Sequence, residues 1–76
     1  MTLKEVMNEY DNRDFNVVEY RTIISIDSDD VDELVGFCCY KNGELITLDN
    51  DTYSLDDVIV KHELYKEDWL VVWCEI

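Results

Sequence analysis

The chain lacks proline, has only 2 glycines and 1 histidine, and contains no apolar run long enough to span a membrane. It does not begin with a charged segment followed by an apolar one, so we expect neither a signal peptide nor a membrane span. Cations are also scarce, with 6 lysine and arginine residues against 19 acidic ones. Hydrophobic residues still make up 47% of the 76 positions, which is enough apolar surface to offset the entropy of chain ordering. We therefore expect one folded, soluble, cytoplasmic domain over residues 1–76.

The formal net charge of -13 is concentrated in the middle of the chain. Between Thr22 and Val60 the only cationic residue is Lys41. The acidic residues of the same stretch are Asp27, Asp29, Asp30, Asp32, Glu33, Glu44, Asp49, Asp51, Asp56 and Asp57. An acidic surface of this density repels nucleic acid and anionic membranes, and it attracts basic protein surfaces. The charge therefore predicts a basic protein as the partner, with no direct binding of nucleic acid or membrane.

Three cysteines, Cys38, Cys39 and Cys74, lie inside apolar runs and show no C-x-x-C spacing. Cysteines in such runs are usually reduced core residues, and adjacent strand residues point to opposite faces. We expect buried thiols, with a metal or redox role as the alternative. For the single histidine, His62, we expect a half-exposed position with cross-strand contacts. No cofactor and no metal site are predicted.

Capping, periodicity and turn residues give the order of the elements. Thr2 and Glu5 form a T-x-x-E capping box, followed by apolar residues at helical spacing, which predicts a short N-terminal helix. Asn42-Gly43 predicts a type I′ hairpin, because both residues tolerate positive φ. The segments rich in β-branched and aromatic residues are 15–26, 34–40, 45–48, 58–65 and 69–75. The predicted fold class is α+β, with the N-terminal helix packed on a twisted antiparallel meander of about five strands.

In an up-and-down meander the connections alternate between the two ends of the sheet. The acidic connections 27–33 and 49–57 would then share one end. The turns that carry Arg13, Lys41 and Lys66 would share the other end. This topology predicts an electrically polar domain with most of its central carboxylates on one edge.

The aromatic residues occur in two different settings. Trp69 and Trp73 share a strand face with Val71 by period two, and we expect this face to pack beneath the helix. Tyr53 lies instead among carboxylates, which is the composition of an interface anchor with a charged rim. The predicted partner-binding residues are Asp27, Asp29, Asp30, Asp32, Glu33, Asp49, Asp51, Tyr53, Asp56 and Asp57.

The acidic loops have two further interpretations. Closely spaced carboxylates suggest calcium binding, but neither loop has the glycine and glutamate of an EF-hand, so solvated loops are the simpler interpretation. The adjacent Asp56 and Asp57 suggest acid/base catalysis, but that chemistry needs a cleft that so small a domain has little volume to build. We therefore predict no catalytic residues and no enzymatic activity.

Four short segments carry a resemblance: Asn42-Gly43-Glu44-Leu45, Leu48-Asp49, Tyr53-Ser54-Leu55-Asp56-Asp57 and Trp69-Leu70-Val71-Val72-Trp73. With these segments the chain resembles small uncharacterised proteins encoded by phages and mobile elements of Firmicutes. Some small acidic proteins of that kind are anti-CRISPR proteins, which occupy the nucleic-acid-binding or PAM-reading surface of a CRISPR effector nuclease. The resemblance implies inhibition by DNA mimicry in a bacterial host cell.

The sequence thus predicts a phage-type inhibitor, a monomer or small homo-oligomer, that binds the basic nucleic-acid-binding surface of a nucleic-acid-processing enzyme such as a CRISPR effector nuclease. The alternative is an acidic phage protein for interaction or assembly, without inhibitory activity, in which the charge provides only solubility and steering. A metal-dependent regulator or enzyme is a third class.

Overall fold

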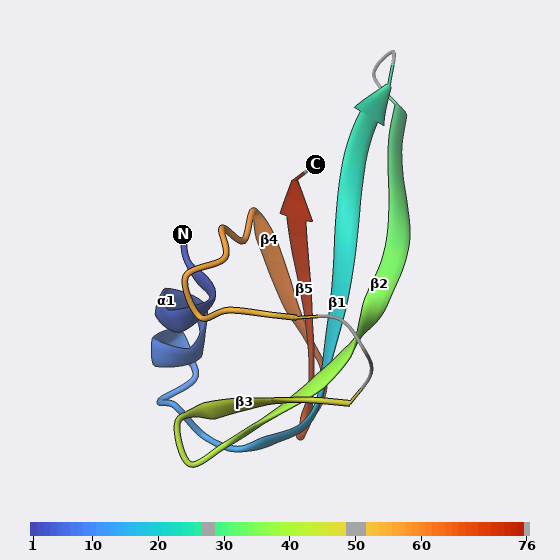
Figure 1. Cartoon of the computed structure of the whole chain (residues 1–76). Helices are drawn as coiled ribbons and strands as arrows, with labels where there is room; N and C mark the ends of the chain where they lie inside the picture. The colour runs from blue at the N-terminus through green and yellow to red at the C-terminus, as the bar shows by residue number, and fades with distance from the viewer. Residues whose placement is uncertain (27–28, 49–51, 76) are drawn as a thin grey trace.

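The computed structural model describes residues 1–26, 29–48 and 52–75. These residues form one short helix and five strands (Figure 1). The elements are α1 (Leu3–Glu9), β1 (Phe15–Ile26), β2 (Asp29–Lys41), β3 (Glu44–Thr47), β4 (Lys61–Lys66) and β5 (Trp69–Glu75). The predicted α+β class is confirmed in this broad form.

The predicted capping box begins helix α1. The Thr2 hydroxyl accepts a hydrogen bond from the Glu5 backbone N–H at 3.3 Å, and the Glu5 carboxylate accepts one from the Thr2 N–H at 2.9 Å. Two free N–H groups of the first turn are thereby satisfied. The hydrogen bonds also hold the pKa of Glu5 below its usual value. After Glu9 the chain turns through Asp11 and Asn12, which both have positive φ, and the helix ends.

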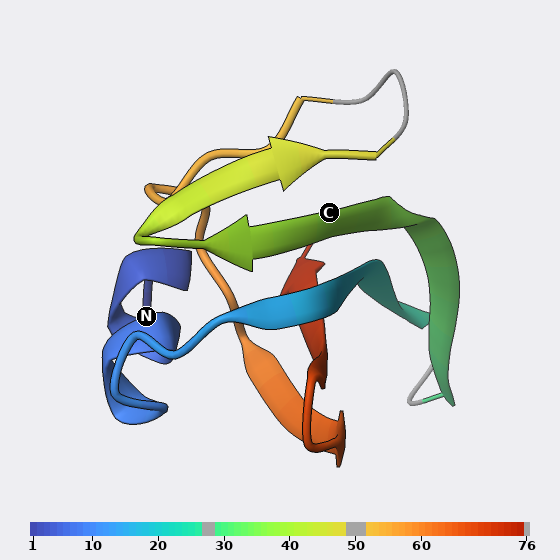
Figure 2. The same cartoon turned by 90° about the horizontal axis from the view of Figure 1, so that it is seen from below.

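The five strands form one sheet in the order β3-β2-β1-β5-β4 (Figures 1 and 2). Neighbouring strands are antiparallel, except that β1 and β5 run parallel. The predicted meander is therefore correct from β1 through β3 and for the β4–β5 hairpin, but wrong between these parts. Instead of pairing with β3, the β4–β5 hairpin lies on the other side of β1.

The chain between β3 and β4 makes this change of side possible. Figure 1 shows its described part, residues 52–60, passing along α1 and entering β4. Its backbone carbonyls at Leu55 and Asp57 each accept a hydrogen bond at 2.9 Å from the first turn of the helix, and Ile59 N–H donates to Met1 at 2.6 Å. Ile59 is only 2% exposed. The predicted strand 58–65 therefore starts at Lys61, because the preceding backbone is bonded to the N-terminal segment and Ile59 packs in the core.

The core lies between α1 and one face of the sheet. The buried residues that form it are Leu3, Val6, Met7, Phe15, Val18, Tyr20, Cys38, Tyr40, Ile59, Leu70 and Val72. On β5 the core residues are thus Leu70 and Val72, not the tryptophans. The prediction that Trp69 and Trp73 pack beneath the helix is wrong, because alternate strand residues point to opposite faces and the fully buried Leu70 and Val72 occupy the helix side.

The predicted acidic loop 27–33 is largely strand. Residues 29–33 continue β2 and pair with β1, so that Asp32 lies opposite Ile23 and Glu33 opposite Thr22. The pairing of β5 with β1 ends at Ile23, and β3 pairs only with residues 38–41 of β2. Beyond these points β1 and β2 continue as two strands, and Figure 1 shows them projecting past β5. We call residues 22–26 and 29–34 the acidic arm.

Candidate partner-binding surface

The predicted partner-binding residues fall in three places. Asp27, Asp49 and Asp51 lie outside the described residues. Asp29, Asp30, Asp32 and Glu33 belong to strand β2 in the acidic arm. Tyr53, Asp56 and Asp57 lie in the connection that runs along α1 to β4.

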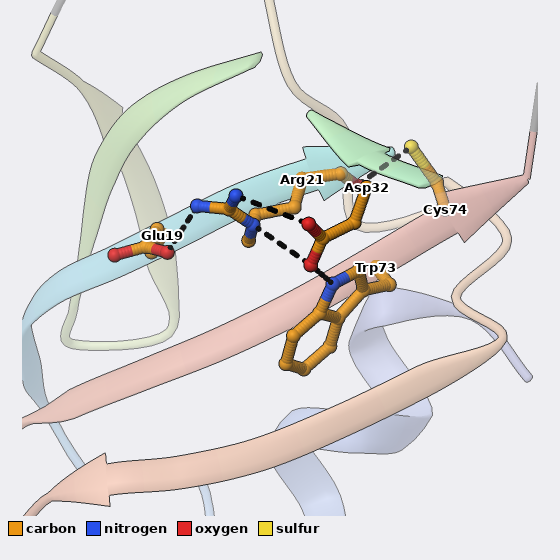
Figure 3. Close-up of polar contacts among 5 residues, drawn as sticks. All are labelled: Glu19, Arg21, Asp32, Trp73 and Cys74. Carbon is orange, nitrogen blue, oxygen red and sulfur yellow. Dashed lines mark hydrogen bonds and ion pairs between the residues drawn. The ribbon is translucent and has the colours of Figure 1, made fainter. Parts of the chain in front are cut away.

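Asp32 is held on the sheet face away from α1 (Figure 3). The Trp73 indole Nε1–H donates to its Oδ2 at 3.1 Å, and the Arg21 guanidinium Nε lies 3.4 Å from the same oxygen. Arg21 also pairs with Glu19 at 2.9 Å. The hydrogen bonds from Trp73 and Arg21 hold the pKa of Asp32 below its usual value. Asp32 therefore remains ionised and joins β1, β2 and β5.

Asp57 lies on the other face, beside the core. It accepts a hydrogen bond from the Tyr20 hydroxyl at 2.6 Å and another from the Ser54 backbone N–H at 3.0 Å. Burial and the hydrogen bond to Asp57 raise the pKa of Tyr20 well above its usual value. The half-buried Tyr53 ring stacks on Tyr20 with centroids 4.5 Å apart. Tyr53 thus packs against the core, in contrast to the exposed anchor that the sequence suggested.

The described carboxylates do not form the single acidic edge that the meander predicted. Asp32 faces away from α1 with Arg21, whereas Asp57 binds Tyr20 on the helix side. Glu33, opposite Thr22 on the strand, shares the side of Tyr20. The acidic residues are therefore divided between both faces of the arm and the connection, because residues 29–33 form a strand with alternating side chains.

The prediction that three cationic turns share the other end of the sheet is confirmed. Arg13 Nη2 donates to the Glu67 carbonyl oxygen at 2.9 Å, which joins the first turn to the β4–β5 turn. Asn16 accepts a hydrogen bond from Lys41 and donates to Asp68 at 2.6 Å. Asn42 and Gly43 both have positive φ, as the predicted type I′ turn requires.

The remaining cations lie at other places on the domain. Arg21 is paired with Glu19 and Asp32, and Lys61 Nζ lies 4.6 Å from the centre of the Trp73 ring. Lys4 belongs to α1. The acidic arm itself contains no lysine or arginine. The arm is therefore acidic, with Arg21 compensating only Asp32, and three of the six cations lie in the turns at the other end of the sheet.

The cysteines and the histidine have structural positions. Cys38 is in the core and the buried Cys39 follows it on the strand, whereas Cys74 is half-buried. Burial raises the pKa of the Cys74 thiol above its usual value. His62 is half-exposed, as predicted, and also contacts the end of the helix: its Nδ1 lies 2.9 Å from the Tyr10 hydroxyl and its Nε2 3.0 Å from Glu9.

Sequence reasoning missed the role of Trp73 in holding Asp32. Glu19 and Arg21 share one face of β1 by period two, but only the parallel pairing of β1 with β5 sets Arg21 opposite Trp73. The described residues contain no pocket, and they show no group of three metal-ligating side chains. Within the same residues no helix is long and apolar enough to cross a membrane.

Comparison of the chain with protein-family models, with curated proteins and with solved structures gave no match.

Proposed function

We propose that this protein is a non-enzymatic inhibitor that binds the basic nucleic-acid-binding surface of a nucleic-acid-processing enzyme, with a CRISPR effector nuclease as the specific candidate. In this proposal the carboxylates of the acidic arm lie where the phosphates of DNA would lie. The arm is the part of the domain that can enter a groove, because it projects from the sheet as two strands (Figure 1).

The charge spacing of the arm is the observation that carries the proposal. Asp29, Asp30, Asp32 and Glu33 lie within five consecutive positions of one strand. At about 3.3 Å per residue these positions span about 13 Å. One DNA strand carries about four phosphates over that length, at 3.4 Å per phosphate. The four carboxylates along β2 are therefore spaced about as closely as the phosphates of one DNA strand, and Arg21 compensates the charge of one of them, Asp32. The average charge density over the whole domain is lower.

The distribution of cations also supports the proposal. The cationic turns meet at the base of the sheet, where Arg13 contacts Glu67 and Lys41 contacts Asn16. A basic groove that accepts the arm would therefore meet carboxylates first and would be far from Arg13 and Lys41. This charge asymmetry also orients the domain during diffusional approach.

A second candidate is an interaction or assembly module without inhibitory activity. The acidic residues of β2 favour it as well, because charged side chains on an exposed strand prevent edge-to-edge aggregation. In that case the charge would be needed for solubility, and DNA would not compete for the partner.

Neutralisation of the arm tests the proposal. The arm variant is Asp29→Asn, Asp30→Asn and Glu33→Gln, which leaves Asp32 to hold Trp73. The matched control is Asp11→Asn, Glu44→Gln and Glu67→Gln, three exposed residues outside the arm, with the same change in net charge. In pull-downs from bacterial lysate over a salt series, the wild type and the control should retain a basic nucleic-acid enzyme at low salt, and the arm variant should not. Equal retention by both variants would contradict the proposal.

A further inference from the structure

The outer edge of β2 in the acidic arm is open. On its inner side β2 pairs with β1 along its length, whereas on its outer side β3 reaches only residues 38–41. Among the described residues, no strand pairs with the outer side of 29–34. A register shift at Val35 separates this stretch from the part of β2 that β3 covers. We call the outer side of residues 29–34 the open edge.

An open edge offers unpaired backbone N–H and C=O groups, which are a template for another strand. The open edge also carries solvent-exposed apolar side chains. Val31 is 44% exposed and Leu34 is 50% exposed. A strand added here would gain backbone hydrogen bonds and would cover these two side chains.

The charge of the open edge determines what can bind it. A second copy of this chain would place carboxylates opposite carboxylates, and like charges on facing strands are destabilising. A segment with lysine or arginine at alternate positions would instead place cations beside Asp32 on one face, or beside Glu33 on the other. The other outer strand, β4, carries Lys61 and Lys66 with one carboxylate, Glu63, so it attracts the same segment less.

We propose that the open edge accepts an extended basic segment of a partner protein as an additional strand of the sheet. The inference deepens the proposed function, on which it rests, because it states how a basic partner would contact the acidic arm. Backbone pairing fixes the register of the partner, and the carboxylates select its charge.

A blocked peptide of seven alternating lysine and valine residues is the probe. The control peptide has the same side chains but is methylated at every backbone nitrogen, so that it keeps the charge and cannot donate backbone hydrogen bonds. Binding to the full-length protein is followed by NMR amide shifts and hydrogen exchange. With the first peptide, alternate amides within 29–34 should exchange about tenfold more slowly, while those of β4 should not change. The methylated peptide should produce no such slowing.

Two single substitutions test the charge selection. Glu33→Gln should weaken peptide binding by about two- to fivefold, the range expected for one exposed charge pair. Glu44→Gln, which removes an exposed charge from β3, should leave binding unchanged.

Three results would overturn the inference: no binding at low salt, equal binding of the methylated peptide, or slowed exchange on β3 or β4 in place of β2. If the peptide fails but DNA still competes with this protein for its partner, only the strand addition is wrong. If the peptide binds as expected and DNA does not compete, the proposed function is wrong and the open edge remains a binding site.

Discussion

At the scale of single residues, Gly43 sets the β2–β3 turn. Its φ is +80°, a conformation that β-branched residues rarely adopt, and nothing lies within 4 Å of a Cβ added there. The cost of a substitution is therefore backbone strain alone. Gly43→Val should lower the free energy of unfolding by about 1 kcal/mol or more, and Gly43→Asn by less, because asparagine tolerates positive φ. Urea denaturation measures both variants, and equal stability of Gly43→Val and wild type would refute the turn assignment.

The second prediction at this scale concerns Asp32 and the pH dependence of the folding stability. Its folded-state pKa is lowered by Trp73 and Arg21, so the stability it contributes is complete above its unfolded pKa and is lost as the pH falls through the folded value. Asp32→Asn should therefore be less stable than wild type at pH 7, and the difference should shrink in acid below the ordinary pKa of 3.8. Denaturation from neutral to acidic pH measures this difference.

Trp73→Phe provides the control for the Asp32 prediction, because it removes the indole N–H that donates a hydrogen bond to Asp32. In the Trp73→Phe background, Asp32→Asn should lower the free energy of unfolding by less than it does in the wild type, since the two residues share one hydrogen bond. A pH-independent effect of Asp32→Asn would show that its ionisation is not coupled to folding.

At the scale of elements, the connection before β4 carries a core side chain. Ile59→Ala should lower the free energy of unfolding by about 2–4 kcal/mol, because it leaves a cavity beneath α1. Val58→Ala is the matched control, since Val58 is 62% exposed, and it should change the stability by less than about 0.5 kcal/mol. Similar effects of the two substitutions in urea denaturation would contradict the packing of this connection on the core.

The same elements show how far the sequence could predict the fold. Helix α1, the Asn42-Gly43 turn and the strand over residues 15–26 follow from short local signals, and the structure confirms them. The neighbour of β1 depends on contacts between distant segments, and period-two alternation in β5 is equally consistent with an antiparallel meander. The alternation in β5 also does not show which of its two faces meets the helix. For this reason the sequence does not reveal that the tryptophans lie on the face away from the helix.

The candidate partner-binding surface was also predictable only in its local features. The density of carboxylates is visible in the sequence, but the division between the two faces follows from residues 29–33 being strand. Asp32 and Asp57 have partners, Trp73 and Tyr20, that lie in other strands. No local pattern links these pairs, because each requires the register of a long-range pairing.

At the scale of the whole molecule, a net charge of -13 opposes compaction. Salt shortens the Debye length from about 10 Å at 0.1 M to about 3 Å at 1 M, which weakens this repulsion. Added sodium chloride should therefore raise the melting temperature, and the increase should be smaller in the arm variant, which has three fewer negative charges. Calorimetry measures both, and a melting temperature that falls with salt would show that ion pairs outweigh the repulsion.

Competition with DNA tests the central claim most directly. The basic partner is loaded with fluorescent DNA, and release of DNA is followed by anisotropy as this protein is added. We predict that the wild type and the matched control displace DNA, that excess DNA reverses the effect, and that the arm variant displaces little. A stable complex that contains this protein, the partner and DNA in its usual groove would contradict the account.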